Sequence, residues 1–195
     1  MTLPHLLVLT DRSQTGGRPL TAVVAAAVDG GATAVVLREK DLGADARRRL
    51  ASRLAALLAP VGGTLLVASA AGLGDGVHLA ADERFPDPAP PIVGRSCHDA
   101  AELRQAAADG CTYATLSPIF ASASKPGYGP PLGVGALADP PLPAYALGGV
   151  DPAHAAACLD AGASGVAVMG AVMRAPDPAA TVGALLDALR ERTAR

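Results

Sequence analysis

Three segments of 16 residues share one sequence pattern, a repeated phrase that limits the folds that the chain can adopt. The copies are AAAVDGGATAVVLREK (25–40), QAAADGCTYATLSPIF (105–120) and ACLDAGASGVAVMGAV (157–172). Each has an alanine-rich helical end, then an acidic residue near a glycine, and then an apolar run. We predict that Gly30, Gly110 and Gly162 end the helices in a left-handed conformation. The runs are continuously apolar, which is typical of parallel strands covered on both faces in repeated βα units.

Runs of this kind predict eight strands, with helices between most of them. The strands are expected at 6–10, 34–37, 64–68, 76–79, 92–96, 113–117, 144–147 and 165–168. Helices are expected at 19–29, 44–58, 99–109, 151–161 and 177–192. Asp99 and Glu102 have the spacing of a capping box, and Asp151 before Pro152 favours a helix start. Between the third and fifth strands only short turns or loops fit.

Eight strands with parallel connections favour a compact (βα)8 TIM barrel, formed by a single domain over residues 1–195. A doubly wound open sheet is the alternative architecture. That fold usually has a glycine-rich turn after its first strand, whereas here Thr10, Asp11 and Arg12 follow the strand and GxGxxG is absent. We therefore predict the barrel.

Composition excludes several classes of function. A net charge of −2 with almost no basic runs argues against a general binder of nucleic acid or of an acidic membrane. The one arginine cluster, between positions 47 and 53, is interpreted as the solvated face of a helix. Three scattered cysteines and the lack of a long apolar segment favour a soluble, cytoplasmic protein. The sequence leaves open whether it forms a homo-oligomer.

Polar side chains gather where the predicted strands end, which is the face that carries the chemistry in a barrel. They are Asp11, Arg12, Arg38, Glu39, Lys40, His78, Asp82, Glu83, Ser96, His98, Ser122, Ser124 and Lys125. The chain has only two lysines, Lys40 and Lys125, and both fall in this ring. Together with Arg38 and the nearby hydroxyls, they indicate an anion site.

Glycines at the ends of the last two strands suggest a phosphate site. Gly148 and Gly149 follow the seventh strand, and Gly170 follows Met169 after the eighth. Their backbone N–H groups could hold a phosphate, at the place where many barrels bind one. Tight turns alone would also explain the paired glycines, and both interpretations stay open.

The histidines and carboxylates give weaker signals. His78 and His98 could act as acid–base groups, although a hydrogen-bonded structural role is more common for a histidine at a strand end. No His/Cys spacing indicates zinc. Asp82 and Glu83 could assist a hard cation such as Mg²⁺ that bridges phosphates.

Ordered motifs along nearly the whole chain resemble the thiamine phosphate synthase/TenI family. They are GGATAVVLREKD (30–41), GDGVHLAADE (74–83), VGRSCHDAAEL (93–103), LSPIFASASKPGYGPPLG (116–133) and ALGGV with AGASGVAVMGAV (146–172). The resemblance implies a (βα)8 barrel that binds thiazole phosphate. In the synthase branch, the barrel joins it to hydroxymethylpyrimidine pyrophosphate with Mg²⁺ as cofactor, releasing pyrophosphate to give thiamine phosphate.

The resemblance also assigns roles to individual residues. Arg38 and Lys40 of the REK motif match the residues that hold the pyrophosphate. Ser96 and the loop residues Ser122, Ser124 and Lys125 match further substrate-binding positions. The backbone around Gly149 and Gly170 matches the cradle for the thiazole phosphate.

The chain departs from the synthase pattern at two single residues and at one pair. Val36 stands where the family usually has Gln, Ala81 stands at another Gln position, and Ala68-Ser69 replaces an Asn-Asp pair whose Asp binds the metal. Glu83 still matches a second metal carboxylate. The missing metal ligand leaves two alternatives to the synthase.

The first alternative is a TenI-like thiazole tautomerase, which needs a base and a phosphate site but no metal. The histidine that serves as base in that branch falls at Pro118, so His98 is considered as a substitute. The second alternative is a non-catalytic protein that binds thiazole phosphate or thiamine phosphate. We take the synthase as the leading hypothesis because the cationic pyrophosphate set is retained.

Overall fold

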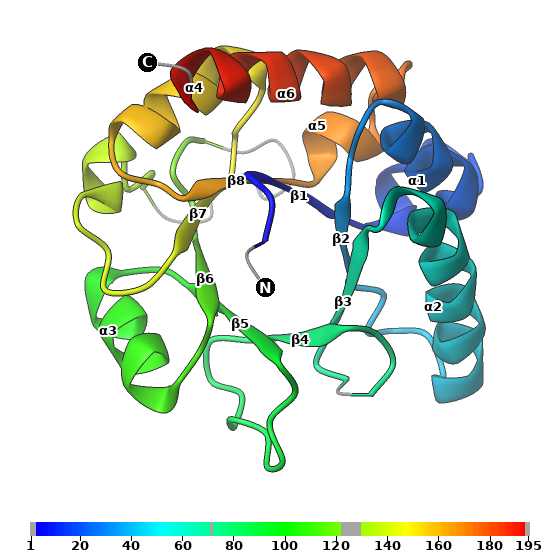
Figure 1. The fold of residues 1–195 in the computed structure, drawn as a ribbon, viewed down its shortest axis with the longest axis horizontal. Coiled ribbons are helices and arrows are strands. Elements are labelled where there is room, and N and C mark those ends of the chain that lie inside the picture. The colour runs from blue at the N-terminus through cyan, green and yellow to red at the C-terminus, as the bar shows by residue number, and fades with distance from the viewer. Residues whose placement is uncertain (1–2, 71, 122–129, 194–195) are drawn as a thin grey trace.

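A computed structural model describes residues 3–70, 72–121 and 130–193 and shows a closed barrel of eight parallel strands in chain order (Figure 1). The strands are β1 (Leu6–Leu9), β2 (Ala34–Leu37), β3 (Thr64–Ala68), β4 (Gly76–Leu79), β5 (Ile92–Cys97), β6 (Tyr113–Leu116), β7 (Ala144–Leu147) and β8 (Gly165–Val168). The first strand pairs with the last, with Leu6 beside Val166. This pairing closes the sheet, so the barrel is confirmed and the open sheet is excluded.

The helices surround the barrel as predicted, with small shifts at their ends. They are α1 (Leu20–Asp29), α2 (Ala44–Leu58), α3 (Ala100–Asp109), α4 (Pro152–Asp160), α5 (Gly170–Met173) and α6 (Pro178–Thr193), with 3-10 turns at Arg12–Gln14, Ala59–Val61 and Val134–Leu137. The one-turn helix α5 was not predicted. In the part of the chain that the structure describes, no helix has the length and apolar character needed to cross a membrane.

Two apolar layers hold the fold together. Alternate strand residues point into the barrel, where they form an inner cluster: Leu7, Leu9, Ala34, Val36, Leu66, Ile92, Tyr113, Tyr145 and Ala167. The other strand residues face outward and pack against the helices. On α1 the side chains of Leu20, Val23, Val24 and Ala27 provide the buried stripe, at helical spacing. The strands are thus covered on both faces, as their continuous apolar runs predict.

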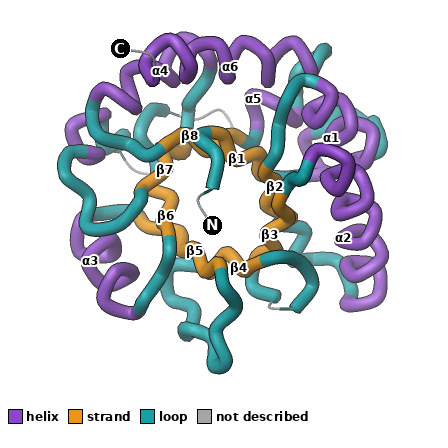
Figure 2. The backbone as a smooth tube through the Cα atoms, in the orientation of Figure 1, coloured by secondary structure: helices purple, strands orange, loops and turns teal. Residues whose placement is uncertain are grey.

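The outside of β3, β4 and β5 is covered differently from the rest of the barrel. Among the described residues, no helix lies between β3 and β4 or within residues 80–91, and loops take their place in Figure 2. The buried side chain of Arg95 supports this region. Its Nη1 donates to the carbonyl of Ala81 (2.9 Å), and its Nη2 lies 3.1 Å from Asp109 Oδ2. Arg95 therefore ties the loop after β4 to α3.

One predicted helix end is wrong by a residue. Gly110 and Gly162 have φ of 92° and 108°, as expected, but Gly30 has a right-handed φ of −75°. The left-handed residue is Gly31, with φ of 104°. In all three copies of the phrase the left-handed glycine stands three residues before the strand that follows it. The distance to that strand therefore predicts which glycine is left-handed.

The interpretation of the arginine cluster is also wrong in part. Arg48, Arg49 and Arg53 are exposed, but Arg47 is only 9% exposed and lies on the buried stripe of α2. Its guanidinium donates to the carbonyl oxygen of Ala68 at the end of β3. Arg47 occupies the stripe position one turn before Ala51, and this spacing was the signal that could have revealed its burial.

Candidate active site

A cavity of about 970 Å³ opens at the carboxyl ends of the strands. Its lining brings together ten of the residues singled out from the sequence: Arg38, Lys40, His78, Asp82, Ser96, His98, Gly148, Gly149, Met169 and Gly170. Glu83 is not part of the lining. Ser122, Ser124 and Lys125 lie outside the described residues, and their roles stay predictions. The convergence agrees with the rule that barrels carry their chemistry at this face.

Arg38 is positioned by its backbone and by the strand that precedes it. Because Val36 points into the barrel, Arg38 continues the inward face just past the end of β2. Its amide N–H donates to Thr10 Oγ1 (3.0 Å), and its guanidinium contacts the sulfur of Met169. The half-buried guanidinium and the exposed ammonium of Lys40 thus supply cationic groups to one side of the cavity.

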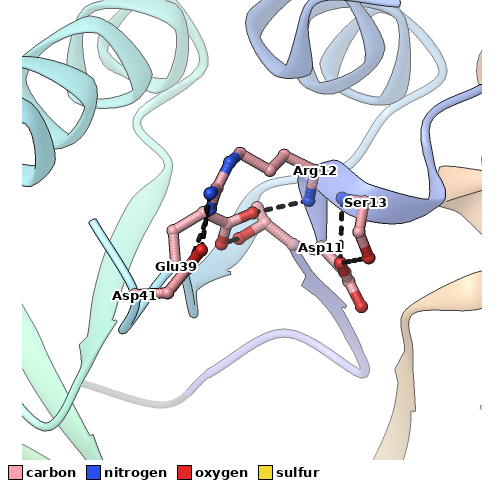
Figure 3. A network of polar contacts seen from close by, with 6 residues as sticks. Asp11, Arg12, Ser13, Glu39 and Asp41 are labelled. Atoms are coloured by element: carbon pink, nitrogen blue, oxygen red, sulfur yellow. Dashed lines mark hydrogen bonds and ion pairs between the residues drawn. The ribbon is translucent and has the colours of Figure 1, made fainter. Parts of the chain in front are cut away.

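Glu39, which lies between these two cations, points the other way and fastens the loops after β1 and β2. It is 4% exposed, and its carboxylate accepts hydrogen bonds from Thr10 Oγ1 (2.7 Å) and from the Arg12 amide (2.8 Å). Arg12 in turn forms a two-pronged ion pair with Asp41, as Figure 3 shows. The buried carboxylate therefore holds the backbone that carries Arg38.

His78 lies inside the barrel with both ring nitrogens engaged. Nδ1 is 2.8 Å from the Tyr113 hydroxyl, and Nε2 is 3.0 Å from Ser96 Oγ. Burial lowers the pKa of His78 to about 3, and the nearby charges of Arg38 and Lys40 act in the same direction. His78 is therefore neutral near pH 7. This contact set supports the structural role over the acid–base role, and it orients the Ser96 hydroxyl at the cavity.

The low pKa of His78 predicts a loss of stability in acid. Between its unfolded pKa of 6.5 and its folded pKa of about 3, the unfolded chain binds a proton that the folded chain does not. The free energy of unfolding keeps the full contribution of His78 above pH 6.5. It then decreases by about 1.4 kcal/mol per pH unit as the pH falls toward 3. Urea unfolding of the native protein and of His78→Gln from pH 7 to pH 4 measures it. The variant should have the flatter profile, and parallel profiles would contradict the assignment.

His98 lies at the rim of the cavity, at the start of α3. Its Nδ1 is 3.0 Å from Glu102 Oε2, which also accepts the His98 amide N–H (2.6 Å). Asp99 caps the helix through the Glu102 amide (2.8 Å), as the capping box predicts. Glu102 thus holds His98 at the edge of the cavity. A catalytic role for His98 stays a prediction.

The paired glycines after β7 have a packing reason as well as a place in the cavity. Gly148 and Gly149 have φ of 91° and 66°, and a Cβ on either would overlap the segment that follows β6. That segment runs beside them, with the amide of Phe120 donating to the Gly148 carbonyl (2.9 Å). The close approach alone requires glycine here. Both residues nevertheless line the cavity, so the phosphate interpretation is kept as a prediction.

The end of β3 and the loop after β4 do not form a metal site among the described residues. One oxygen of Glu83 accepts both the Ser69 hydroxyl (2.5 Å) and the Ala80 amide (3.0 Å). Asp82 is exposed, and no group of three His, Cys, Asp or Glu side chains in the described ranges is placed to hold a metal ion. The Arg47 guanidinium also lies on the Ala68 carbonyl, beside the position where the family has its metal ligand. The residues present therefore do not fit a protein-held Mg²⁺.

Arg174 is a cationic residue of the cavity that the sequence analysis missed. It follows α5 directly and lines the cavity, and its guanidinium donates to the side-chain oxygen of Gln14. The detectable signal was its spacing from Gly170, since positions i and i+4 lie on one side of a helix. The short helix that makes this spacing meaningful was not recognised.

Comparisons with known proteins agree with this geometry. A family model described as thiamine monophosphate synthase matches residues 6–172. A putative thiamine-phosphate synthase of Geobacter sulfurreducens is 40% identical, covering 96% of this chain and 95% of the relative. A thiamine-phosphate synthase of Roseiflexus castenholzii is 39% identical, covering 95% of this chain and 88% of the relative.

Among solved structures, a thiamine phosphate pyrophosphorylase from Pyrococcus furiosus superposes on the chain with a TM-score of 0.84. It is 26% identical in sequence, and the match covers 96% of each chain. The sequence and the fold of this chain are thus similar to the same group of proteins over nearly their whole length.

Proposed function

The chain belongs to the thiamine monophosphate synthase family, and we propose that it is a thiamine-phosphate synthase that joins hydroxymethylpyrimidine pyrophosphate to thiazole phosphate. The enzyme is thus a transferase of thiamine biosynthesis with small-molecule phosphate substrates. The observation that carries the proposal is the cavity in which Arg38 and Lys40 face the glycine-rich ends of β7 and β8.

The reaction is a substitution at the methylene carbon of the pyrimidine. The thiazole nitrogen forms a bond to this carbon with its lone pair, and the bond from the carbon to the pyrophosphate oxygen breaks. The pyrophosphate leaves with the electron pair of that bond, and the nitrogen becomes positively charged. No proton has to move in this step.

The main task of the protein in such a step is to stabilise the charge that grows on the leaving group. A fixed guanidinium and an ammonium next to the pyrophosphate interact more strongly with the transition state than with the substrate. Glu39 keeps the backbone that carries Arg38 in place before the substrate arrives, because it holds the loops after β1 and β2 together. We assign the thiazole phosphate to the turns at Gly149 and Gly170.

The histidines favour the synthase over the tautomerase. A tautomerase needs a base that accepts a proton from the thiazole, whereas the synthase step needs none. Both nitrogens of His78 are engaged, the pKa of His78 is about 3, and Pro118 stands where the tautomerase pattern has its base. His98 would be the remaining candidate.

We also propose a cytoplasmic location, which the three buried, unbridged cysteines support.

We propose that Mg²⁺ reaches the cavity on the pyrophosphate of the substrate and is not held beforehand by the protein. The carboxylate of Glu83 is already engaged by Ser69 and Ala80. Of the two carboxylates in the described lining, Asp151 caps α4 and Asp82 is exposed. A hard cation needs several oxygen ligands, and a pyrophosphate supplies them from its own oxygens.

The metal proposal predicts that the free protein has no saturable site for Mn²⁺, used as a spectroscopic substitute for Mg²⁺. Electron paramagnetic resonance of Mn²⁺ should show no binding tighter than about 1 mM, because a single carboxylate is a poor ligand set. The double variant Ala68→Asn/Ser69→Asp restores two oxygen donors and should bind more tightly. Ser69 has φ of 53°, a conformation that Asp also tolerates. If the native protein binds Mn²⁺ as tightly as the double variant does, the proposal is contradicted.

One assay separates the proposed function from its alternatives. The purified protein is given thiazole phosphate and the pyrimidine pyrophosphate, with and without Mg²⁺, and thiamine phosphate is measured by mass spectrometry. In a second tube it is given the thiazole tautomer precursor alone. Formation of thiamine phosphate supports the synthase, tautomer conversion without it supports the isomerase, and ligand-dependent thermal stabilisation without either supports a binding protein.

A further inference from the structure

The guanidinium of Arg174 occupies the space that a side chain at position 170 would need. A Cβ built on Gly170 would overlap Nη1, Nη2 and Cζ of Arg174. Gly170 has no positive φ, so its backbone conformation does not require glycine. The close approach of the arginine does require it. Arg174 is therefore folded back over the end of β8 and into the lining of the cavity, although part of its side chain is exposed.

The turn that carries Arg174 is fixed from both sides by Arg18. Nη2 of Arg18 donates to the carbonyl of Met173 (2.8 Å), and Nη1 donates to the carbonyl of Ala175 (2.7 Å). The Nε of Arg18 donates to the carbonyl of Thr15 (2.9 Å). The backbone before and after Arg174 is thereby anchored to the loop after β1. The position of the guanidinium thus depends on a fixed turn and not on the side chain alone.

A neutral contact orients the Arg174 side chain. Its Nη1 donates to the amide oxygen of Gln14, and the amide nitrogen of Gln14 donates to Asp11 Oδ2 (2.7 Å). The same carboxylate group receives the amide and the hydroxyl of Ser13. An amide oxygen directs a guanidinium without cancelling its charge. A guanidinium carries five N–H donors in a fixed fork, and the Arg174 side chain lines the cavity.

We propose that Arg174 binds the phosphate group of thiazole phosphate at the end of β8. The inference rests on the proposed function, which assigns this end of the cavity to the thiazole phosphate. Arg174 lies against Gly170, while Arg38 contacts the neighbouring Met169 from the β2 side. The cavity thus has two guanidinium groups, of which Arg38 serves the pyrophosphate and Arg174 the phosphate monoester. A planar guanidinium matches two phosphate oxygens and is charged at every physiological pH.

The assignment makes Arg174 a determinant of substrate choice. A phosphate monoester carries almost two negative charges near pH 7, whereas the free thiazole alcohol carries none. An arginine at this site therefore favours the phosphorylated substrate. Removing the guanidinium should weaken the binding of thiazole phosphate and leave the binding of the alcohol nearly unchanged.

The test compares the native protein with Arg174→Ala and Arg174→Gln. The KM for thiazole phosphate should rise about tenfold, the value typical of one charge-assisted contact at a partly exposed site. The kcat and the KM for the pyrimidine pyrophosphate should change less than twofold. Arg190→Ala, at an exposed position on α6, is the matched control and should behave like the native protein. An unchanged KM for thiazole phosphate in both Arg174 variants overturns the proposal.

A second measurement keeps this inference separate from the proposed function. Isothermal titration with thiazole phosphate, and with inorganic phosphate as a competitor, reports binding without turnover. If the native protein makes no thiamine phosphate but binds thiazole phosphate, and the Arg174 variants bind it about tenfold more weakly, only the proposed function fails. If the native protein is active and the variants bind normally with native melting temperatures, only the role of Arg174 fails. If thiazole phosphate binds neither the native protein nor the Arg174 variants, the role proposed for Arg174 is overturned as well.

Discussion

Replacing Arg38 with alanine should reduce kcat/KM for thiamine phosphate formation about 100-fold to 1000-fold, the usual loss when one fixed donor to a developing charge is removed. The guanidinium is half-buried and held by its neighbours, so its interaction with the leaving pyrophosphate is weakly screened. Most of the loss should appear in kcat, because the charge grows as the bond breaks. Steady-state kinetics with both substrates measures the effect.

Two further variants make this prediction specific. Arg38→Lys keeps the charge but loses the planar fork, so it should recover only part of the activity. Arg104→Ala removes an exposed arginine on α3 that is not part of the cavity lining, and its kinetics should match the native protein. The prediction is wrong if Arg38→Ala keeps kcat/KM within about threefold of native while its melting temperature is unchanged.

Replacing Gly94 with alanine should cost about 3 kcal/mol of the free energy of unfolding or prevent folding altogether. Gly94 lies on β5 and points into the barrel, where the ring of Tyr113 lies directly over its Cα. A new Cβ would overlap this ring. Tyr113 is fully buried and its hydroxyl is bonded to His78, so the ring has no free space into which to move. Urea unfolding followed by circular dichroism measures the loss.

The matched control for this substitution is Gly183→Ala. Gly183 lies inside α6 with open space where a Cβ would be, so alanine should stabilise the protein by about 0.5–1 kcal/mol. In the double variant Gly94→Ala/Tyr113→Leu, the ring that causes the overlap is gone. Its total loss should therefore be clearly smaller than the sum of the two single losses. Strict additivity would mean that the Tyr113 ring is not the cause.

The fold was largely predictable because its signals are local. The strand Thr64–Ala68 and the helix Ala44–Leu58 were predicted to the residue, since each is an uninterrupted pattern with glycine just outside it. Differences appear at ends such as Gly30 and Gly31, where two neighbouring glycines are both able to end the helix and the packing selects one. The helix Gly170–Met173 was missed because a single turn has too few residues to show a period.

The site was predictable only in part, for a related reason. Residues that directly follow strands, such as Arg38 and Ser96, reach the cavity because the fold brings all carboxyl ends of the strands to one face. Whether a side chain then meets a substrate or another residue is not a local property. Glu83 was considered as a metal ligand, but its carboxylate is engaged by Ser69 and Ala80. Arg47 was assigned to the surface, but it reaches the Ala68 carbonyl.

By itself, the sequence determined the eight strands, their order around the barrel, the family and the arginine and lysine at the end of β2. These features follow from apolar runs, turn residues and motif spacing, which act over a few neighbouring positions. Only the tertiary structure decided that Arg174 covers Gly170, that His78 is locked between Tyr113 and Ser96, and that the carboxylate of Glu83 accepts hydrogen bonds from Ser69 and Ala80. Arg174 and Gly170 are only four residues apart, but the turn that carries Arg174 is held by Arg18 from the loop after β1. The contacts of His78 and Glu83 likewise join different strands and loops, and the fold of the barrel brings their atoms together.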